Sequence, residues 1–253
     1  MTLQELFQSI ADAIREKTGE TGKLKPTAYP EKIRGITGSG LSQEYVDSIF
    51  EGTIKTVKND TARFLYASAF RGFPSLQSVE MNNVGDIQSE ALKNAAALES
   101  ANFPKAGMIL SNAFENCFKL NSINVSNAES IGSYAFKMCK SLQEVSFNTQ
   151  VTIGTYAFQG CTALQKVEIA QLGDDSFAAN AFSGCTALTA VVIRSVNYYP
   201  APKTSAFAGT PIANGGGYIY VPRNELNWMQ YESEWTGNYD LRAIEDWPEI
   251  TGG

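Results

Sequence analysis

The chain has 253 residues, of which 43% are hydrophobic and 18% charged, and it carries a formal net charge of −6. This composition is that of a folded protein, and the length suffices for one large domain or two ordinary ones. The negative charge argues against nucleic acid or an anionic membrane surface as a partner, and the absence of a long apolar run argues against membrane insertion.

Residues 1–40 are predicted to form a helical segment that ends in a flexible Gly-Ser linker. Thr2 is suited to cap the first helix, with Glu5 three residues later, and Gly19 is suited to end it. The apolar stripe of this helix must bury against the rest of the chain, against a second copy in a homo-oligomer, or against another protein. The candidate docking residues are Leu3, Leu6, Phe7, Ile10 and Ile14.

The same segment has no basic stretch followed by an uninterrupted apolar run. We therefore expect neither a secretory signal peptide nor a transmembrane segment.

Residues 41–222 are predicted to be an array of repeats. The stretch IGSYAFKMCKSLQEV at residues 131–145 returns as IGTYAFQGCTALQKV at residues 153–167 and as FAANAFSGCTALTAV at residues 177–191. Weaker copies begin at residues 65, 87 and 109, and the copies, aligned on their Ala-Phe pair, follow one another at steps of 22 to 25 residues. A repeat of this length is one turn of a solenoid, here called a rung, which buries its apolar side only against its neighbours.

Three apolar columns run through these rungs and define the expected core. The aromatic column comprises Phe70, Leu92, Phe114, Phe136, Phe158, Phe182 and Phe207. The leucine column follows it by six residues and comprises Leu76, Leu98, Leu120, Leu142, Leu164 and Leu188. The third column precedes the aromatic column by five residues and comprises Leu65, Ile87, Ile109, Ile131, Ile153 and Phe177.

Two periodicities within a rung indicate its elements. Val145 and Phe147 alternate with polar residues, which predicts a short strand with one buried face. Ala135, Phe136 and Cys139 recur at helical spacing, which predicts a short helix or 3-10 turn. We therefore predict an α/β solenoid, a leucine-rich repeat array of about eight rungs of 22–25 residues.

One cysteine occupies the same place in four successive rungs: Cys117, Cys139, Cys161 and Cys185. Zinc sites need closely spaced ligand pairs, which this arrangement lacks. Neighbouring rungs lie about 4.8 Å apart, but their Cβ vectors run parallel and suit a disulfide poorly. We expect reduced, buried packing cysteines, with disulfides or a metal ladder as the alternatives.

Residues 223–253 are predicted to cap the C-terminal end of the array. All three tryptophans of the chain lie here, and short helices are expected at residues 225–231 and 239–244. The end of a solenoid exposes an open core and a free sheet edge that must be covered. An aromatic patch that stacks on glycans is the alternative interpretation.

The repeat frame closely resembles the BspA-like class of bacterial leucine-rich repeats, most completely at residues 131–147 and 153–169. That resemblance implies a surface or secreted protein that binds host proteins, bacteria or glycans. Residues 1–36, especially IADAIREKTG at 10–19 and YPEKIRGI at 29–36, resemble the opening of phage and prophage structural proteins of Gram-positive gut bacteria. This second resemblance implies attachment to other virion proteins and release by lysis.

Catalysis is not expected. The chain has no histidine, which excludes triads and metal sites that depend on imidazole. Cysteines in an apolar column are poor nucleophiles, and acidic pairs such as Asp174 and Asp175 lie in connecting segments. We predict neither cofactor nor metal.

The remaining function is recognition. It would use the outward-facing strand positions and the longest insertion between repeats, which contains Tyr198 and Tyr199. The candidate binding surface comprises Asn102, Asn124, Glu144, Asn148, Lys166, Glu168, Arg194, Tyr198 and Tyr199. We expect a partner that is a protein or glycan on a bacterial or host surface. The first hypothesis is a phage virion or tail-associated recognition protein, docked through residues 1–36; the alternative is an extracellular bacterial adhesin.

Overall fold

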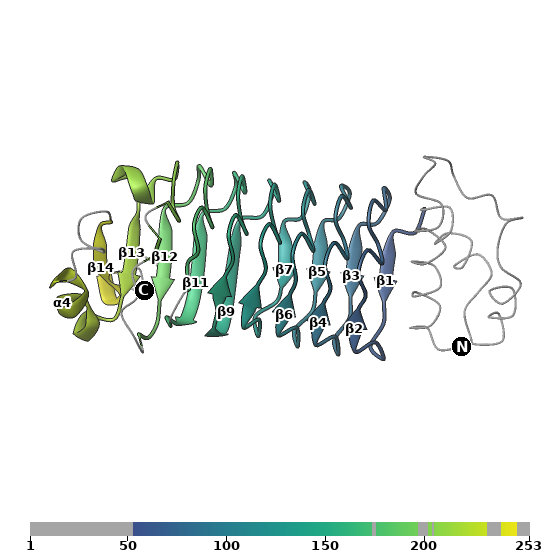
Figure 1. Ribbon diagram of the computed structural model, residues 1–253, viewed down its shortest axis with the longest axis horizontal. Coiled ribbons are helices and arrows are strands. Elements are labelled where there is room, and N and C mark those ends of the chain that lie inside the picture. The colour runs from purple at the N-terminus through teal and green to yellow at the C-terminus, as the bar shows by residue number, and fades with distance from the viewer. Residues whose placement is uncertain (1–52, 174–175, 197–201, 204, 232–238, 247–253) are drawn as a thin grey trace, which may run out of the picture.

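The structure is a computed structural model that describes residues 53–173, 176–196, 202–203, 205–231 and 239–246. These residues form a long solenoid of about eight rungs (Figure 1). The predicted solenoid is therefore confirmed. The helical segment predicted over residues 1–40, with its docking residues Leu3, Leu6, Phe7, Ile10 and Ile14, lies outside the described residues.

Each rung, and the C-terminal segment that follows the last rung, contributes one strand to a row of parallel strands, here called the first strand row. The members of this row are β1 (Thr56–Lys58), β3 (Ser78–Glu80), β5 (Ser100–Asn102), β7 (Ser122–Asn124), β9 (Glu144–Gln150), β11 (Lys166–Gln171), β12 (Ala190–Ile193), β13 (Tyr218–Val221) and β14 (Leu241–Ala243). Equivalent strand residues of neighbouring rungs lie opposite each other, as Val57 does with Val79 and Val145 with Val167. The row comprises two hydrogen-bonded sheets, one from β1 to β7 and the other from β9 to β14.

A second strand row, with two residues from each of five rungs, lies on another side of the solenoid. Its members are β2 (Phe64–Leu65), β4 (Asp86–Ile87), β6 (Met108–Ile109), β8 (Ser130–Ile131) and β10 (Thr152–Ile153). Each of these strands turns its third-column residue into the core. The sequence pattern did not reveal these strands, because two residues are too few to show an alternating period.

The remaining side of each rung is a run of turns rather than a helix, so the predicted α/β class is wrong and the repeats form a β-solenoid. Tyr134 (φ 60°) and Met138 (φ 63°) flank Phe136 in the left-handed region. An α-helix cannot pass through residues of the opposite hand, so the helical spacing at this place produces turns instead. Residues equivalent to Tyr134 in other rungs also have left-handed backbones, namely Ser68, Glu90, Asn112, Tyr156 and Asn180. The same holds for residues equivalent to Met138, namely Gly72, Asn94, Asn116, Gly160, Gly184 and Gly209.

The backbone amides of these turns alternate between two kinds of partner. The N–H of Phe136 donates to the carbonyl of Ala157 in the next rung, at 2.7 Å, whereas the N–H of Lys137 donates to Tyr134 within its own rung, at 3.1 Å. The turns are therefore joined from rung to rung much as the strands are.

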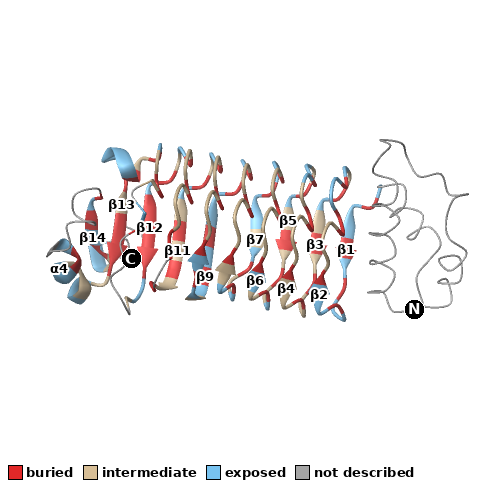
Figure 2. Ribbon diagram, in the orientation of Figure 1, coloured by how far each residue is buried: buried red, intermediate tan, exposed pale blue. Residues whose placement is uncertain are grey.

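Figure 2 shows the buried residues inside the solenoid along its whole described length. The side chains of the aromatic and leucine columns are buried, as predicted. The rings of Phe114, Phe136 and Phe158 stack at centroid distances of 4.9 and 5.0 Å, with interplanar angles of 8°. Such a stack needs one ring from each rung in the same orientation, which the nearly constant repeat length supplies.

Of the two helices predicted at the C-terminal end, one is present and the other is not. The helix expected at residues 225–231 is present within α4 (Arg223–Tyr231), preceded by the short η3 (Ile212–Asn214). Residues 239–244, also expected to be helical, instead form β14 and the start of η4 (Ile244–Asp246). Leu241 and Ala243 alternate with exposed Arg242 and pair with β13, so the period of two prevails there.

Candidate recognition surface

The solvent side of the first strand row, here called the outer face, carries most of the sequence-predicted binding residues. Asn102 and Asn124 lie on β5 and β7, Glu144 and Asn148 on β9, and Lys166 and Glu168 on β11. Arg194 directly follows β12. The structure therefore brings these residues onto one face, whereas Tyr198 and Tyr199 lie outside the described residues.

A ladder of side-chain amides runs along the N-terminal part of this face. Asn124 donates through Nδ2 to Oδ1 of Asn102, at 2.8 Å, and Asn102 donates in the same way to Asn82, at 2.9 Å. Asn82 then donates to a carboxylate oxygen of Asp60, at 2.7 Å. These groups satisfy one another, so this stretch presents an ordered polar surface that ends at the carboxylate of Asp60.

Ion pairs between neighbouring rungs neutralise the charges farther along the face. Glu144 pairs with Lys166 at 3.2 Å, and Glu168 pairs with Arg194. Both pairs are solvent-exposed in part, so each contributes little to stability. Their effect on recognition is that the predicted charged residues present no net charge as a set.

The first strand row is interrupted between β7 and β9, at a place here called the β7–β9 junction. At the neighbouring junctions, the N–H of Ser122 donates to Glu99, and that of Lys166 to Gln143. Within the described residues, the equivalent bond from Glu144 to Asn121 is not formed, and β7 and β9 are not hydrogen-bonded neighbours. The strands rejoin only farther along, where the N–H of Asn148 donates to Ser126 at 2.6 Å.

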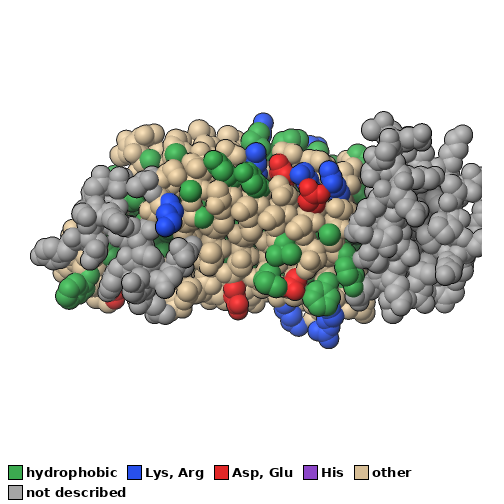
Figure 3. All heavy atoms as spheres, in the orientation of Figure 1, with side chains coloured by type: hydrophobic (Ala, Val, Ile, Leu, Met, Phe, Trp, Pro, Cys, Tyr) green, Lys and Arg blue, Asp and Glu red, His purple; other side chains and the backbone are tan. Residues whose placement is uncertain are grey.

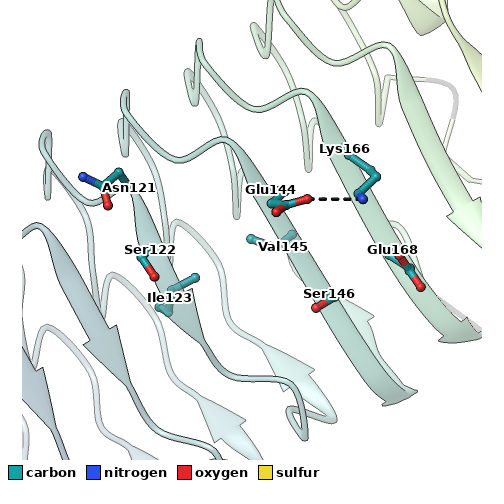
Figure 4. A pocket seen from close by; sticks show the side chains of 8 residues that line it. All are labelled: Asn121, Ser122, Ile123, Glu144, Val145, Ser146, Lys166 and Glu168. Atoms are coloured by element: carbon teal, nitrogen blue, oxygen red, sulfur yellow. Dashed lines mark ion pairs between the residues drawn. The ribbon is translucent and has the colours of Figure 1, made fainter. Parts of the chain in front are cut away.

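A shallow groove of about 280 Å³ lies over this junction (Figure 4). Ile123 and Val145 form its apolar floor; Ile123 occupies an inward position of the repeat yet remains partly exposed there. The polar side chains around the groove come from three rungs: Asn121, Ser122, Glu144, Ser146, Lys166 and Glu168. Glu144, Lys166 and Glu168 were predicted as binding residues.

The remaining groove residues carry no sign of a site in their sequence. Ile123 and Val145 fit the buried strand pattern, and Ser122 and Ser146 resemble the small polar residues of any exposed strand face. No sequence signal marks the interruption, because the repeat step across it is 22 residues, as at its neighbours.

The C-terminal end of the outer face departs from the expected polar surface. Ala190 and Val192 occupy outward positions of β12, yet both are buried, together with Tyr220 of β13. Tyr218 and Ile244 pack against this cluster. The candidate binding surface therefore comprises the outer face of the rungs that precede β12, together with Arg194.

The four cysteines lie in the core and have the environment of packing residues. The thiol of each donates to the carbonyl oxygen of the aromatic-column residue of the preceding rung, at 3.0–3.3 Å. Burial raises the pKa of Cys117 to about 12 and also raises the pKa of Cys139 and Cys161. Thiolate chemistry is therefore suppressed at neutral pH.

The part of the chain that the structure describes contains neither a metal-binding cluster nor a membrane-spanning helix. There, no group of three or more acidic, cysteine or histidine side chains is arranged to hold a metal ion. No described helix has the length and apolar character required to span a membrane. On the side of the molecule seen in Figure 3, uncharged polar side chains and backbone cover most of the described surface, and most visible charges lie over the N-terminal half.

A model of the BspA type leucine rich repeat region matches residues 43–108 and 107–215, in six copies. No curated protein matches the sequence.

Three solved structures illustrate the similarity. A leucine-rich repeat protein from Bacteroides ovatus is 24% identical, with a TM-score of 0.48, over 67% of this chain and 52% of that one. The T. pallidum leucine rich repeat protein is 25% identical, with a TM-score of 0.44, over 56% and 66%. The pneumococcal vaccine antigen PcpA is 18% identical, with a TM-score of 0.47, over 76% and 42%. The matches span less than two thirds of each of those chains.

Proposed function

Because the chain belongs to the BspA-type leucine-rich repeat family, we propose that it is a non-enzymatic recognition protein that binds its partner through the outer face. The observation that carries this proposal is the gathering of Glu144, Lys166 and Glu168 around one groove. A rigid array of fixed polar groups lowers the entropic cost of binding, since few side chains must be ordered.

The partner is a protein or glycan of a bacterial envelope or of a host surface. For the location, we propose a phage virion, in which residues 1–36 attach the chain to tail components. The support is the resemblance of that segment to phage structural proteins. A bacterial surface adhesin is the competing location, favoured by the repeat family alone.

The binding proposal is tested with the purified full chain, fluorescently labelled, on intact bacterial cells, on isolated envelope fractions and on mucin. In the test variant, Asn124→Arg and Asn148→Arg place bulk and charge on the exposed outer face. In the control variant, Thr162→Arg and Thr186→Arg make the same change at exposed turn positions. We expect binding that falls about tenfold in the test variant and stays within about twofold in the control. Equal loss in both variants, or no binding to any surface, would overturn the proposal.

The location is tested by immunogold electron microscopy of induced cultures and of a phage-free strain. Labelling of particle tails is the expected result. Labelling of intact cells in the phage-free strain would establish the adhesin instead.

A further inference from the structure

We propose that the β7–β9 junction is a ligand site and that its ligand is an uncharged saccharide. This inference rests on the proposed recognition function and adds both the place and the chemical class of the ligand. Four features of the junction support it: unpaired backbone groups, a groove of small volume, a partly exposed apolar floor, and neutralised charges.

The backbone groups provide the first argument. Every other junction from β1 to β12 has a hydrogen bond equivalent to the one missing between Glu144 and Asn121. The amide of Val125 also has no partner within the described residues, although the equivalent amides of Met81 and Phe103 donate to the next rung. The interruption therefore leaves backbone donors and acceptors of adjacent strands facing one gap. Such strong hydrogen-bonding groups favour a ligand that can both donate and accept hydrogen bonds.

Hydroxyl groups supply both functions, since each can donate and accept. The side chains around the gap complement a sugar in the same way. Ser122 and Ser146 offer hydroxyls, Asn121 offers an amide, and the carboxylates of Glu144 and Glu168 accept. Figure 4 shows these side chains on neighbouring strands around the groove.

The size and floor of the groove limit the ligand. A volume of about 280 Å³ is at the lower end of small-molecule pockets, which suits one or two sugar rings. The partly exposed side chain of Ile123 gives the apolar face of a ring a surface to cover.

The charges argue for an uncharged ligand. Lys166 is paired with Glu144, and Glu168 with Arg194, so an anionic or cationic ligand would have to replace an existing pair. A neutral ligand can use the free acceptor positions of both carboxylates and leave the pairs intact.

The alternative occupant, an extended peptide inserted as an extra strand, does not fit the spacing. Insertion requires flanking strands about 9.6 Å apart, twice the normal separation. Residues of β7 and β9 still approach within 8 Å between Cα atoms. A ligand must therefore enter from above the outer face, with small groups reaching into the gap.

The experiment uses the full chain, isotopically labelled, and follows backbone amide resonances by NMR. The probes are the neutral disaccharides maltose, cellobiose, lactose and N,N′-diacetylchitobiose, with 3′-sialyllactose as a charged probe and a blocked alanine tripeptide as a peptide probe. In the test variant, Ser122→Trp fills the groove. In the control, Ser78→Trp makes the same change in the same column, two rungs away.

We expect at least one neutral disaccharide to shift the amide resonances of Glu144 and Val125 at concentrations up to about 10 mM. Its affinity should fall about tenfold in Ser122→Trp and stay within about twofold in Ser78→Trp. The inference is overturned if no neutral disaccharide shifts these amides, if only the charged or peptide probe does, or if both variants respond alike. Should the unmodified chain still bind cells or envelopes in those cases, the recognition function stands and only the saccharide site is refuted.

Discussion

The thiol of Cys139 donates a hydrogen bond to the carbonyl oxygen of Phe114, one rung earlier, at 3.3 Å. This contact joins the cysteine column to the aromatic column. It also gives the buried thiol of Cys139 a hydrogen-bond partner within the core. Similar contacts recur at the other three cysteines, so the properties of one thiol are expected at all four.

The first prediction concerns thiol reactivity. At pH 8 the native chain should react with Ellman's reagent at none of its cysteines, because burial raises the pKa of Cys117 to about 12 and that of Cys139 in the same direction. In guanidinium chloride all four should react. Rapid labelling of the native chain would contradict the burial of this column.

The same shift predicts a loss of stability in alkali. A thiol whose folded pKa lies above its unfolded value of 9.0 stabilises the fold fully below pH 9. This contribution is lost as the pH rises from about 9 towards 12, since only the unfolded chain ionises in that window. Denaturation midpoints measured across pH 7–11 should therefore fall above pH 9, and Cys117→Ala should reduce the slope of that fall.

The second prediction concerns the stacked rings. Phe136→Ala should lower the free energy of unfolding by about 3–5 kcal/mol, because it removes a buried ring that stacks on both neighbours. Phe136→Leu should cost only about 1 kcal/mol, since Leu92 fills the same column elsewhere. Chemical denaturation measures both, and equal costs would contradict this prediction, because they would show that loss of the aromatic ring, and not loss of buried volume, sets the cost.

The third prediction concerns left-handed turns. Gly184 has a φ of 73°, so Gly184→Ala should cost about 1–2 kcal/mol through backbone strain, although the nearest atom to the new Cβ is 3.8 Å away. Gly107 has the same clearance and no left-handed φ, so Gly107→Ala should leave stability unchanged or raise it by about 0.4–1 kcal/mol. If the two variants are equally stable, strain is not the cause.

The fourth prediction concerns acid stability. Lys93 pairs with Glu115 at 2.9 Å and with Glu90 at 3.0 Å. Burial acts to raise the pKa of Glu115, but the hydrogen bonds from Lys93 and Asn112 outweigh it and lower the pKa below 4.5. The carboxylate therefore stabilises the fold above pH 4.5, and this stability is lost as the pH falls through the lowered value. Glu115→Gln should flatten the dependence of the denaturation midpoint on pH between about 5 and 3; an unchanged slope would contradict the assignment.

The repeat columns were predictable because each records the same environment many times. Phe136, Leu142 and Ile131 have equivalents in five or more rungs, and burial follows directly from that recurrence. The turn side was not predictable from spacing, since Ala135, Phe136 and Cys139 fit a helix until the left-handed Tyr134 and Met138 are seen.

The site was only partly predictable for a different reason. Glu144, Lys166 and Glu168 could be placed on one face from the period of the strand. The groove beside them arises from a hydrogen bond that Glu144 does not make, and a missing bond leaves no pattern in residue types. Tyr239 and Leu241 show a similar limit, because pairing with β13 decides the structure of so short a segment.

The interruption between β7 and β9 has a mechanical consequence. At the other rungs from β2 to β10, a tensile load along the axis is shared by both strand rows and by the turns. At this rung the load passes through β6 and β8, through the turn bonds, such as that from Phe114 to Ala135, and through the bond from Asn148 to Ser126. When the chain is stretched in an optical trap, the rungs from β2 to β10 should separate first at the β7–β9 junction.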